Sequence, residues 1–138
     1  MTKQLKSNRG EGTYIDAVIF VFVSALIISF MLNVFSIIVA KQQMDICADQ
    51  LTRQIQLSGE VNEDTESLFN MICGKMRSLK DVRYTVETTY YDGKKIQLGT
   101  PFKVTVTATA YLGGYGDLRL ASIELISTAA GVSEEYWK

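Results

Sequence analysis

The side chains that could carry covalent or metal chemistry are few in this chain. None of its 138 residues is histidine, so Ser–His and Cys–His pairs are excluded and the commonest zinc ligand is missing. One cluster of acids stands out: Glu60, Glu63, Asp64 and Glu66. These acids fall in a turn and at the start of a predicted helix, where capping and solvation explain them. We therefore predict no enzymatic activity, no cofactor and no metal site. A paired-carboxylate enzyme is the remaining alternative, because the sequence does not show which acids meet in space.

The two cysteines, Cys47 and Cys73, are the other reactive groups. Each flanks the apolar stripe of a predicted helix, so the two thiols could meet where these helices pack. Two alternatives stay open: a disulfide between them, or two small buried hydrophobic side chains. The glycine-rich segment 112–117 suggests a phosphate-binding loop, but it joins two predicted strands and opens no helix. No small-molecule substrate is expected.

A long helix is predicted over residues 13–58, and it carries Cys47. From Ala17 to Ala40, 24 consecutive residues carry no charge and 20 of them are apolar. As a helix this run would reach about 36 Å, more than the membrane's hydrocarbon core of about 30 Å. A helix also satisfies its own backbone hydrogen bonds in lipid. The sequence therefore predicts one membrane span at about residues 17–40.

The charges around the span predict its orientation. Residues 1–10 contain Lys3, Lys6 and Arg9 and no acid, whereas the chain after residue 40 has a small excess of acids. By the positive-inside rule, residues 1–12 form a basic leader in the cytoplasm. Residues 59–138 then form a head on the outer side of the cell membrane. The net charge of −1 and the pI of about 5.4 argue against a nucleic-acid partner.

Two stripes run along the predicted helix. Beyond the membrane, apolar residues at helical spacing predict a face that packs on the head: Met44, Cys47, Ala48, Leu51 and Ile55. Inside the span, small and polar residues advance by three or four positions: Ala25, Ser29, Asn33, Ser36 and Ala40. Such stripes let transmembrane helices approach closely, and the amide of Asn33 is costly in lipid without a partner. We predict that this stripe packs against another copy or a partner span, the alternative being hydroxyls bonded to their own helix.

The head is predicted to be α+β. Asn62 to Thr65 predicts the start of a second helix that extends to about Leu79, and Ser58-Gly59 ends the first. The period then changes to two, which indicates strands over residues 82–91, 102–110 and 118–128, the last one bulged near residues 121–122. Asp92-Gly93 indicates a turn, and residues 95–98 form a short strand or part of that turn. The expected architecture is a lollipop, with a long helix, a second helix and a three- or four-stranded antiparallel sheet.

The N-terminal sequence resembles a known signal. Residues 6–16, KSNRGEGTYID, combine a basic leader, glycines and an acid directly before the apolar run. This pattern resembles the class III signal of type IV pilin-like proteins, and more closely the TadE-type pseudopilins and the uncharacterised TadE-like proteins of Gram-positive bacteria. The segments AKQQMD (40–45) and GVSEEYWK (131–138) are similar to the latter group. The resemblance covers both ends of the chain and the helix, about half of the chain. For the middle of the chain, the likeness is based on the predicted architecture alone.

The resemblance implies processing by a membrane prepilin peptidase. Cleavage would follow a glycine, at Gly12-Thr13 or, as the second choice, at Gly10-Glu11, and would leave the apolar helix on the mature protein. The family usually places an acid at position five of the mature chain, where it neutralises a neighbour's N-terminal amine. Asp16 falls at position four or six instead. Either the register is relaxed or the protein is an uncleaved relative.

The resemblance also implies a structural function. The protein would be a minor pilin or pseudopilin of a Tad-like type IV pilus or related secretion system, incorporated in a surface filament with other pilin-like subunits or with itself. Asp16 and the stripe from Ala25 to Ala40 would serve assembly. The alternative is a permanently anchored single-pass protein whose head binds a partner in a conjugation, secretion or envelope complex.

Overall fold

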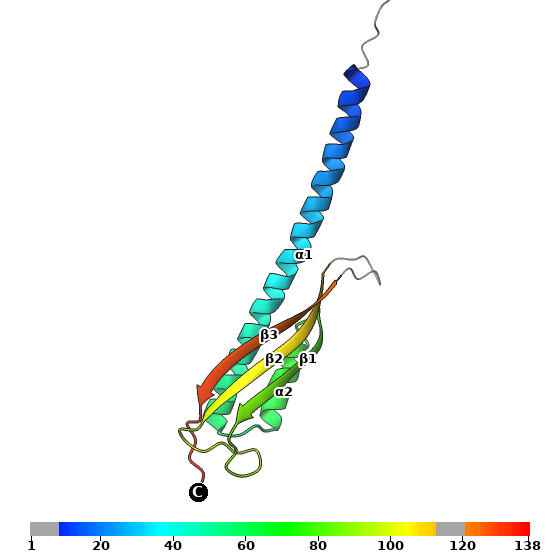
Figure 1. Ribbon diagram of the computed structural model, residues 1–138. Helices are drawn as coiled ribbons and strands as arrows, with labels where there is room; N and C mark the ends of the chain where they lie inside the picture. The colour runs from blue at the N-terminus through cyan, green and yellow to red at the C-terminus, as the bar shows by residue number, and fades with distance from the viewer. Residues whose placement is uncertain (1–8, 113–120) are drawn as a thin grey trace, which may run out of the picture.

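The computed structural model describes residues 9–112 and 121–138 (Figure 1). Within them it contains two helices and three strands: α1 (Arg9–Ser58), α2 (Glu63–Cys73), β1 (Leu79–Thr88), β2 (Pro101–Leu112) and β3 (Ala121–Val132). The first eight residues of the predicted leader, most of the glycine-rich loop (113–117) and the predicted start of the last strand (118–120) lie outside the described residues. The predicted α+β arrangement of a long helix, a second helix and an antiparallel sheet is confirmed.

Helix α1 is continuous, but its two halves have different surroundings. Its N-terminal half projects away from the rest of the molecule, whereas its C-terminal half lies against the sheet and α2 (Figure 1). The helix ends at Ser58, as predicted. Gly59 follows with a φ of +66°, a backbone conformation that glycine adopts without the steric cost other residues meet.

The sheet is an antiparallel meander with β2 in the middle. Alternate side chains of β2 are buried, as the period of two predicted: Phe102, Val104, Val106, Ala108 and Ala110. Of the two alternatives for residues 95–98, the short strand does not form: Lys95 makes isolated bridges with Glu60 and, across the turn, with Asp92. The backbone of this segment instead bonds to the end of α1, where the N–H of Ile96 donates to the carbonyl of Gly59 at 2.6 Å.

The hydrophobic core lies between the sheet and the C-terminal half of α1. The predicted apolar stripe of α1 is confirmed, since its members are at most 1% exposed: Met44, Cys47, Ala48, Leu51 and Ile55. The buried side chains of β2 belong to the same core cluster, and α2 adds the partly buried Leu68, Phe69 and Ile72. This half of α1 and the sheet therefore form one packed unit.

Helix α2 is shorter than predicted. Its start is as expected, because the side chain of Asn62 accepts a hydrogen bond from the N–H of Thr65 at 3.1 Å and acids occupy the first turn. It ends before Gly74 rather than near Leu79, because glycine is a poor helix former, and successive turns carry the chain to β1. Met76 and Leu79 are nevertheless buried. The apolar spacing thus predicted their burial but not their conformation.

Strand β3 also differs from its prediction. It continues to Val132 and pairs with β2 in one unbroken register, without the predicted bulge. A Cβ on Gly131 would come within 2.8 Å of both the Phe102 ring and the Thr52 methyl group. Small side chains therefore face α1 here, while Ile126 on the other face is 54% exposed. The bulge was predicted from the change of phase in the apolar alternation near residues 121–122, and this prediction was wrong because the strand keeps one register and leaves Ile126 on the exposed face. The pairing of β1 with β2 shifts register between Lys80 and Arg83.

Candidate functional site

The N-terminal half of α1 is an exposed apolar surface. Between Tyr14 and Leu32 its large apolar side chains are 45–75% exposed. The helix is long and apolar enough to cross a membrane, and none of its most apolar 18-residue window is buried. A core helix of similar composition would be mostly buried. The exposed half of α1 is therefore the largest candidate functional surface of the described residues.

The head contacts α1 nearer to the N-terminus of the helix than the sequence predicted. A cavity of about 60 Å³ lies between the two, lined on α1 by Asn33, Ser36, Ile37 and Ala40 and on the head by Ser78, Ala110 and Tyr111. Ala40 itself is 1% exposed and belongs to the core. The predicted span of residues 17–40 thus overlaps the segment that carries the head. The part of α1 that the head leaves uncovered is Gly12–Leu32.

The predicted assembly stripe is divided by this junction. Ala25 and Ser29 are exposed, Asn33 is half-buried and Ala40 is in the core. The side-chain amide of Asn33 donates a hydrogen bond to the carbonyl of Ser29, one turn earlier, at 2.9 Å. The amide of Asn33 thus bonds back to its own helix, which is the alternative to a bond with another span. Ser36 is exposed at the rim of the junction cavity.

The stripe and the buried face of α1 form one row. Its positions advance by three or four throughout: Ala25, Ser29, Asn33, Ser36, Ala40, Met44, Cys47, Leu51 and Ile55. Residues at this spacing share one side of a helix. The head covers the row from Ala40 to Ile55. The small or polar residues form the part of the row that lies N-terminal to Ala40.

The residues of the predicted processing site lie in the first turns of α1, which begins at Arg9. Gly12, Thr13 and Asp16 are exposed, and a Cβ on Gly12 would meet no described atom within 4 Å beyond its chain neighbours and the backbone of its own helix. Gly10 and Glu11 are helical as well. All of these residues are at the end of α1 that projects away from the head (Figure 1).

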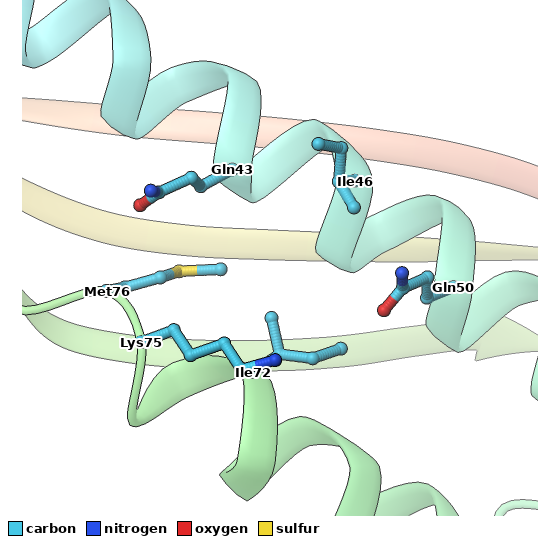
Figure 2. Close-up of a pocket in the computed structure, with 6 residues that line it drawn as sticks. All are labelled: Gln43, Ile46, Gln50, Ile72, Lys75 and Met76. Atoms are coloured by element: carbon cyan, nitrogen blue, oxygen red, sulfur yellow. The ribbon is translucent and has the colours of Figure 1, made fainter.

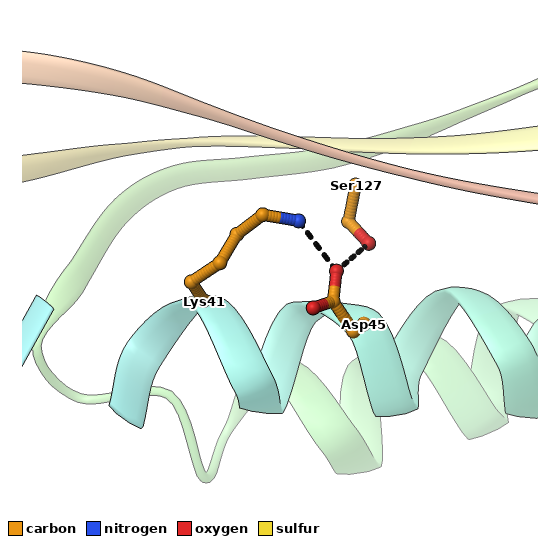
Figure 3. A network of polar contacts seen from close by, with 3 residues as sticks. All are labelled: Lys41, Asp45 and Ser127. Atoms are coloured by element: carbon orange, nitrogen blue, oxygen red, sulfur yellow. Dashed lines mark hydrogen bonds and ion pairs between the residues drawn. The ribbon is translucent and has the colours of Figure 1, made fainter. Parts of the chain in front are cut away.

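A polar network fixes β3 to α1 (Figure 3). Asp45 on α1 accepts hydrogen bonds from the ammonium group of Lys41, one turn earlier, and from the hydroxyl group of Ser127 on β3. These two donors hold the pKa of Asp45 below its usual value, with the Lys41 hydrogen bond the larger cause. The spacing of Lys41 and Asp45 predicts their ion pair. No sequence pattern points to Ser127, because its partner lies 82 residues away.

The C-terminal tail closes the far end of the head. The indole N–H of Trp137 donates to the carbonyl of Gly59 at 3.1 Å. The side chain of Gln97 bonds the backbone of Trp137 twice, at 2.8 and 2.9 Å, and the ammonium group of Lys95 lies 4.4 Å from the centre of the indole ring. We call Gly59, Lys95, Gln97 and Trp137 the C-terminal clasp. It joins the end of α1, the loop before β2 and the tail.

A groove of about 160 Å³ separates α1 from α2 (Figure 2). Its lining mixes apolar, amide and ammonium side chains: Gln43, Ile46, Gln50, Ile72, Lys75 and Met76. Ile46 is 54% exposed and Leu57, further along α1, is 58% exposed. These two apolar side chains lie outside the buried face of α1 and are available for contact with another molecule.

The two cysteines lie close enough to influence each other. They are not bonded to each other in the structure, where Cys47 lies in the core and Cys73 is half-buried at the end of α2. Burial, with a smaller contribution from Cys73, raises the pKa of the Cys47 thiol to about 11. Cys47 therefore behaves as a small buried hydrophobic group at neutral pH. The disulfide stays a prediction.

The acid cluster has a structural explanation. Glu63, Asp64 and Glu66 form the first turn of α2, and the carboxylate of Glu60 accepts a hydrogen bond from the amide of Asn62 at 3.1 Å. Among the described residues, no group of three or more potential metal ligands lies together. Asn62 thus caps α2, and the acids of the first turn complement the positive end of the helix dipole.

These features define a class of protein: a small α+β head carried on a helix that is exposed and apolar over its N-terminal half. The chain belongs to the family described as a domain of unknown function (DUF4320), whose model matches residues 21–138. The match begins inside the exposed half of α1 and includes the whole head. Comparison with curated proteins and with solved structures gives no match.

Proposed function

We propose that the protein is a single-pass membrane protein whose N-terminus is cytoplasmic and whose head lies on the outer side. The segment Gly12–Leu32 would occupy the lipid. It is the part of α1 that the head leaves uncovered, and its length of about 30 Å equals the hydrocarbon thickness of a bilayer. A bilayer that reached Ala40 would also enclose the end of the sheet at Ala110. The structure therefore favours a span that begins and ends earlier than residues 17–40.

Within the membrane, the protein serves as a structural subunit, a minor pilin or pseudopilin of a Tad-like type IV pilus or related secretion system. The observation that carries this proposal is the single row along α1. The head covers this row beyond Ala40, and small residues continue it to Ser29 and Ala25, which are exposed. Small residues at helical spacing let a second helix approach closely in lipid. The exposed part of the row is thus suited to contact with the span of another subunit.

Processing by a prepilin peptidase belongs to the same proposal. Cleavage after Gly12 would place Thr13 at the new N-terminus and leave Asp16 one turn inside the helix. In a subunit packed beside another, the carboxylate of Asp16 would pair with the neighbour's N-terminal amine, because both charges are costly when unpaired near lipid.

One observation favours the alternative of a permanent anchor. The amide of Asn33 already donates to the carbonyl of Ser29, so this side chain needs a second helix less than a free amide would. An anchor requires neither cleavage nor self-packing. Its head would bind a partner in a conjugation, secretion or envelope complex.

The test compares assembly of variants in cells that contain the assembly system. We expect Ser29→Leu, Asn33→Leu and Asp16→Ala to insert normally but to lower the yield of filament or complex by about tenfold, since interfacial changes of about 1.4 kcal/mol have that effect. Met31→Leu, at an exposed position on the other side of α1, is the matched control. Wild-type yields for all three variants would contradict the subunit role. An intact Met1 in cells with active peptidase would contradict the cleavage.

A further inference from the structure

The two edges of the sheet differ in how they are protected. Strand β2 lies in the middle, so within the described residues β1 and β3 are the edges. Natural edge strands usually carry charges or a bulge that discourage pairing with another chain. Strand β1 has both, since its register shifts between Lys80 and Arg83 and Asp81 in that shift has a φ of +52°. Strand β3 is paired in one unbroken register and Glu124 is its only charged residue.

The outward backbone groups of both edges are free to pair. Alternate N–H and C=O groups of an edge strand point away from its neighbour in the sheet. Among residues 9–112 and 121–138, no backbone hydrogen bond that leaves the helices and the sheet involves residues 80–88 or 121–132. Three apolar side chains of β3 are also exposed: Ile123, Ile126 and Val132. Strand β3 can therefore accept a further strand, and β1 can do so beyond its register shift.

The direction of the strands restricts which edges of two copies can meet. Each of β1 and β3 is antiparallel to β2, so the two edges run in the same direction. Their arrows point away from the exposed end of α1 (Figure 1). The proposed span would hold that end of every copy in one membrane. Edge strands of neighbouring copies would then be parallel to each other.

The charges favour one of the three parallel pairings. Lys80 and Glu124 lie in the same row of the sheet, one on each edge, with Thr109 between them. Two β3 edges at equal depth would place Glu124 beside Glu124, and two β1 edges would place Lys80 and Arg83 beside themselves. Like charges at such positions are destabilising. A β3 edge beside a β1 edge instead brings Glu124 to Lys80, and a slide to the next row on this face brings it to Arg83.

The acids of β1 do not reverse this preference. Asp81 lies in the register shift and faces no residue of β2. Glu87 lies at the other end of the strand, where the ammonium group of Lys103 is 3.7 Å from its carboxylate.

We propose that the β3 edge of one copy pairs in parallel with the β1 edge of the next, so that their sheets become continuous. This inference rests on the proposed membrane span and subunit role. Each copy would use β3 for one neighbour and β1 for the other, a heterologous contact that continues without closing. Strand pairing alone is weak in water, but a shared membrane raises the effective concentration of the copies.

Paired cysteines test the contact. Thr85 and Thr128 are exposed and lie in one row, on either side of Thr105. Within a chain they are two strand spacings apart, about 10 Å, which is too far for a disulfide. Between joined copies the distance would be about 5 Å. In cells that contain the assembly system, mild oxidation of Thr85→Cys/Thr128→Cys, with the half-buried thiol removed by Cys73→Ser, should give a ladder of disulfide-linked oligomers.

The single variants are the matched controls. Thr85→Cys alone and Thr128→Cys alone should give little product, whereas cells that express both chains should give a dimer. A strong dimer from Thr128→Cys alone would show two β3 edges in contact and overturn the proposed arrangement.

Charge reversal tests the selected pairing. Glu124→Lys should weaken the ladder about fivefold, the effect of about 1 kcal/mol. Adding Lys80→Glu/Arg83→Glu should restore it, and Lys94→Glu, exposed and outside both edges, should leave it unchanged. No ladder in cells where Ser29 still crosslinks to other copies would overturn the edge pairing while the subunit role stands. Loss of both products would overturn the subunit role and the edge pairing with it.

Discussion

The indole of Trp137 and the carbonyl of Gly59 are joined by a hydrogen bond of 3.1 Å, although 78 residues separate them. The same carbonyl accepts the N–H of Ile96 at 2.6 Å. This backbone oxygen at the end of α1 thus accepts hydrogen bonds from both the loop before β2 and the C-terminal tail. A Cβ on Gly59 would lie 2.4 Å from the Cβ of Glu135, so only glycine lets the tail approach this closely.

This relationship predicts that the tail stabilises the head. Trp137→Phe keeps an aromatic ring but removes the donor, and should lower the free energy of unfolding by about 1 kcal/mol. Trp137→Ala also removes the ring beneath Lys95 and should cost about 3 kcal/mol. Denaturant unfolding followed by circular dichroism measures both. Tyr136→Ala, at a side chain that is 61% exposed, is the control and should change little. Equal effects of Trp137→Ala and Tyr136→Ala would show that the clasp contributes nothing.

Two glycines are predicted to respond in opposite directions to alanine. Gly131→Ala would press a methyl group against Phe102 and Thr52, each 2.8 Å away, and should destabilise the head by about 1–3 kcal/mol. Gly74 has a φ of −60° and its added Cβ would find the nearest atom at 3.4 Å. Gly74→Ala should therefore be neutral or stabilise by about 0.5 kcal/mol. Thermal unfolding of the two variants checks this. A Gly131→Ala variant as stable as the wild type would contradict the packing of β3 on α1.

The Lys41–Asp45–Ser127 network predicts a pH dependence of stability. Because the folded-state pKa of Asp45 lies below its unfolded value of about 3.9, its stabilisation is fully present above that value. It is lost as the pH falls through the lower folded-state pKa. Wild type should thus be more stable than Asp45→Asn at pH 7, and the difference should shrink below pH of about 4. Unfolding curves between about pH 7 and pH 2.5 measure it. A difference that grows on acidification would reverse the assigned sign.

The two thiols should differ in reactivity. With a pKa of about 11 and no exposed surface, Cys47 has almost no thiolate at pH 8. Alkylation should modify Cys73 first and Cys47 only after unfolding, with mass spectrometry identifying the site. Under denaturing conditions both should react, which serves as the control. Comparable rates in the folded protein would contradict the burial of Cys47. A mass two protons lower before reduction would instead demonstrate the predicted disulfide.

Much of the fold was predictable where side chains repeat at a regular spacing. The apolar stripe of α1, the alternation of β2 and the stop at Gly59 follow from helical and strand periods. Periodicity gave wrong predictions where a residue is buried but does not lie in the helix or strand that its spacing indicates. Met76 and Leu79 reach the core from turns, and Gly131 faces the core with no side chain at all.

The candidate site was predictable in part for a similar reason. The row from Ala25 to Ala40 is visible in the sequence, but the level at which the head begins to cover it is not. That level depends on contacts between α1 and residues such as Ser78 and Tyr111, which are distant in the chain. The clasp and the Asp45–Ser127 bond were not predicted because their side-chain hydrogen bonds join residues 40 to 82 positions apart.

The central claim is that the uncovered part of α1 lies in the membrane and packs against neighbouring subunits along one side. Photocrosslinking in intact cells tests it directly, with the reactive residue placed at Ser29 or, as the matched control on the other side of the helix, at Met31. We predict a ladder of self-crosslinked products from Ser29 and little product from Met31. A single discrete partner from Ser29 would favour the anchor. Equal product from both positions, or none in cells that assemble the complex, would contradict the account.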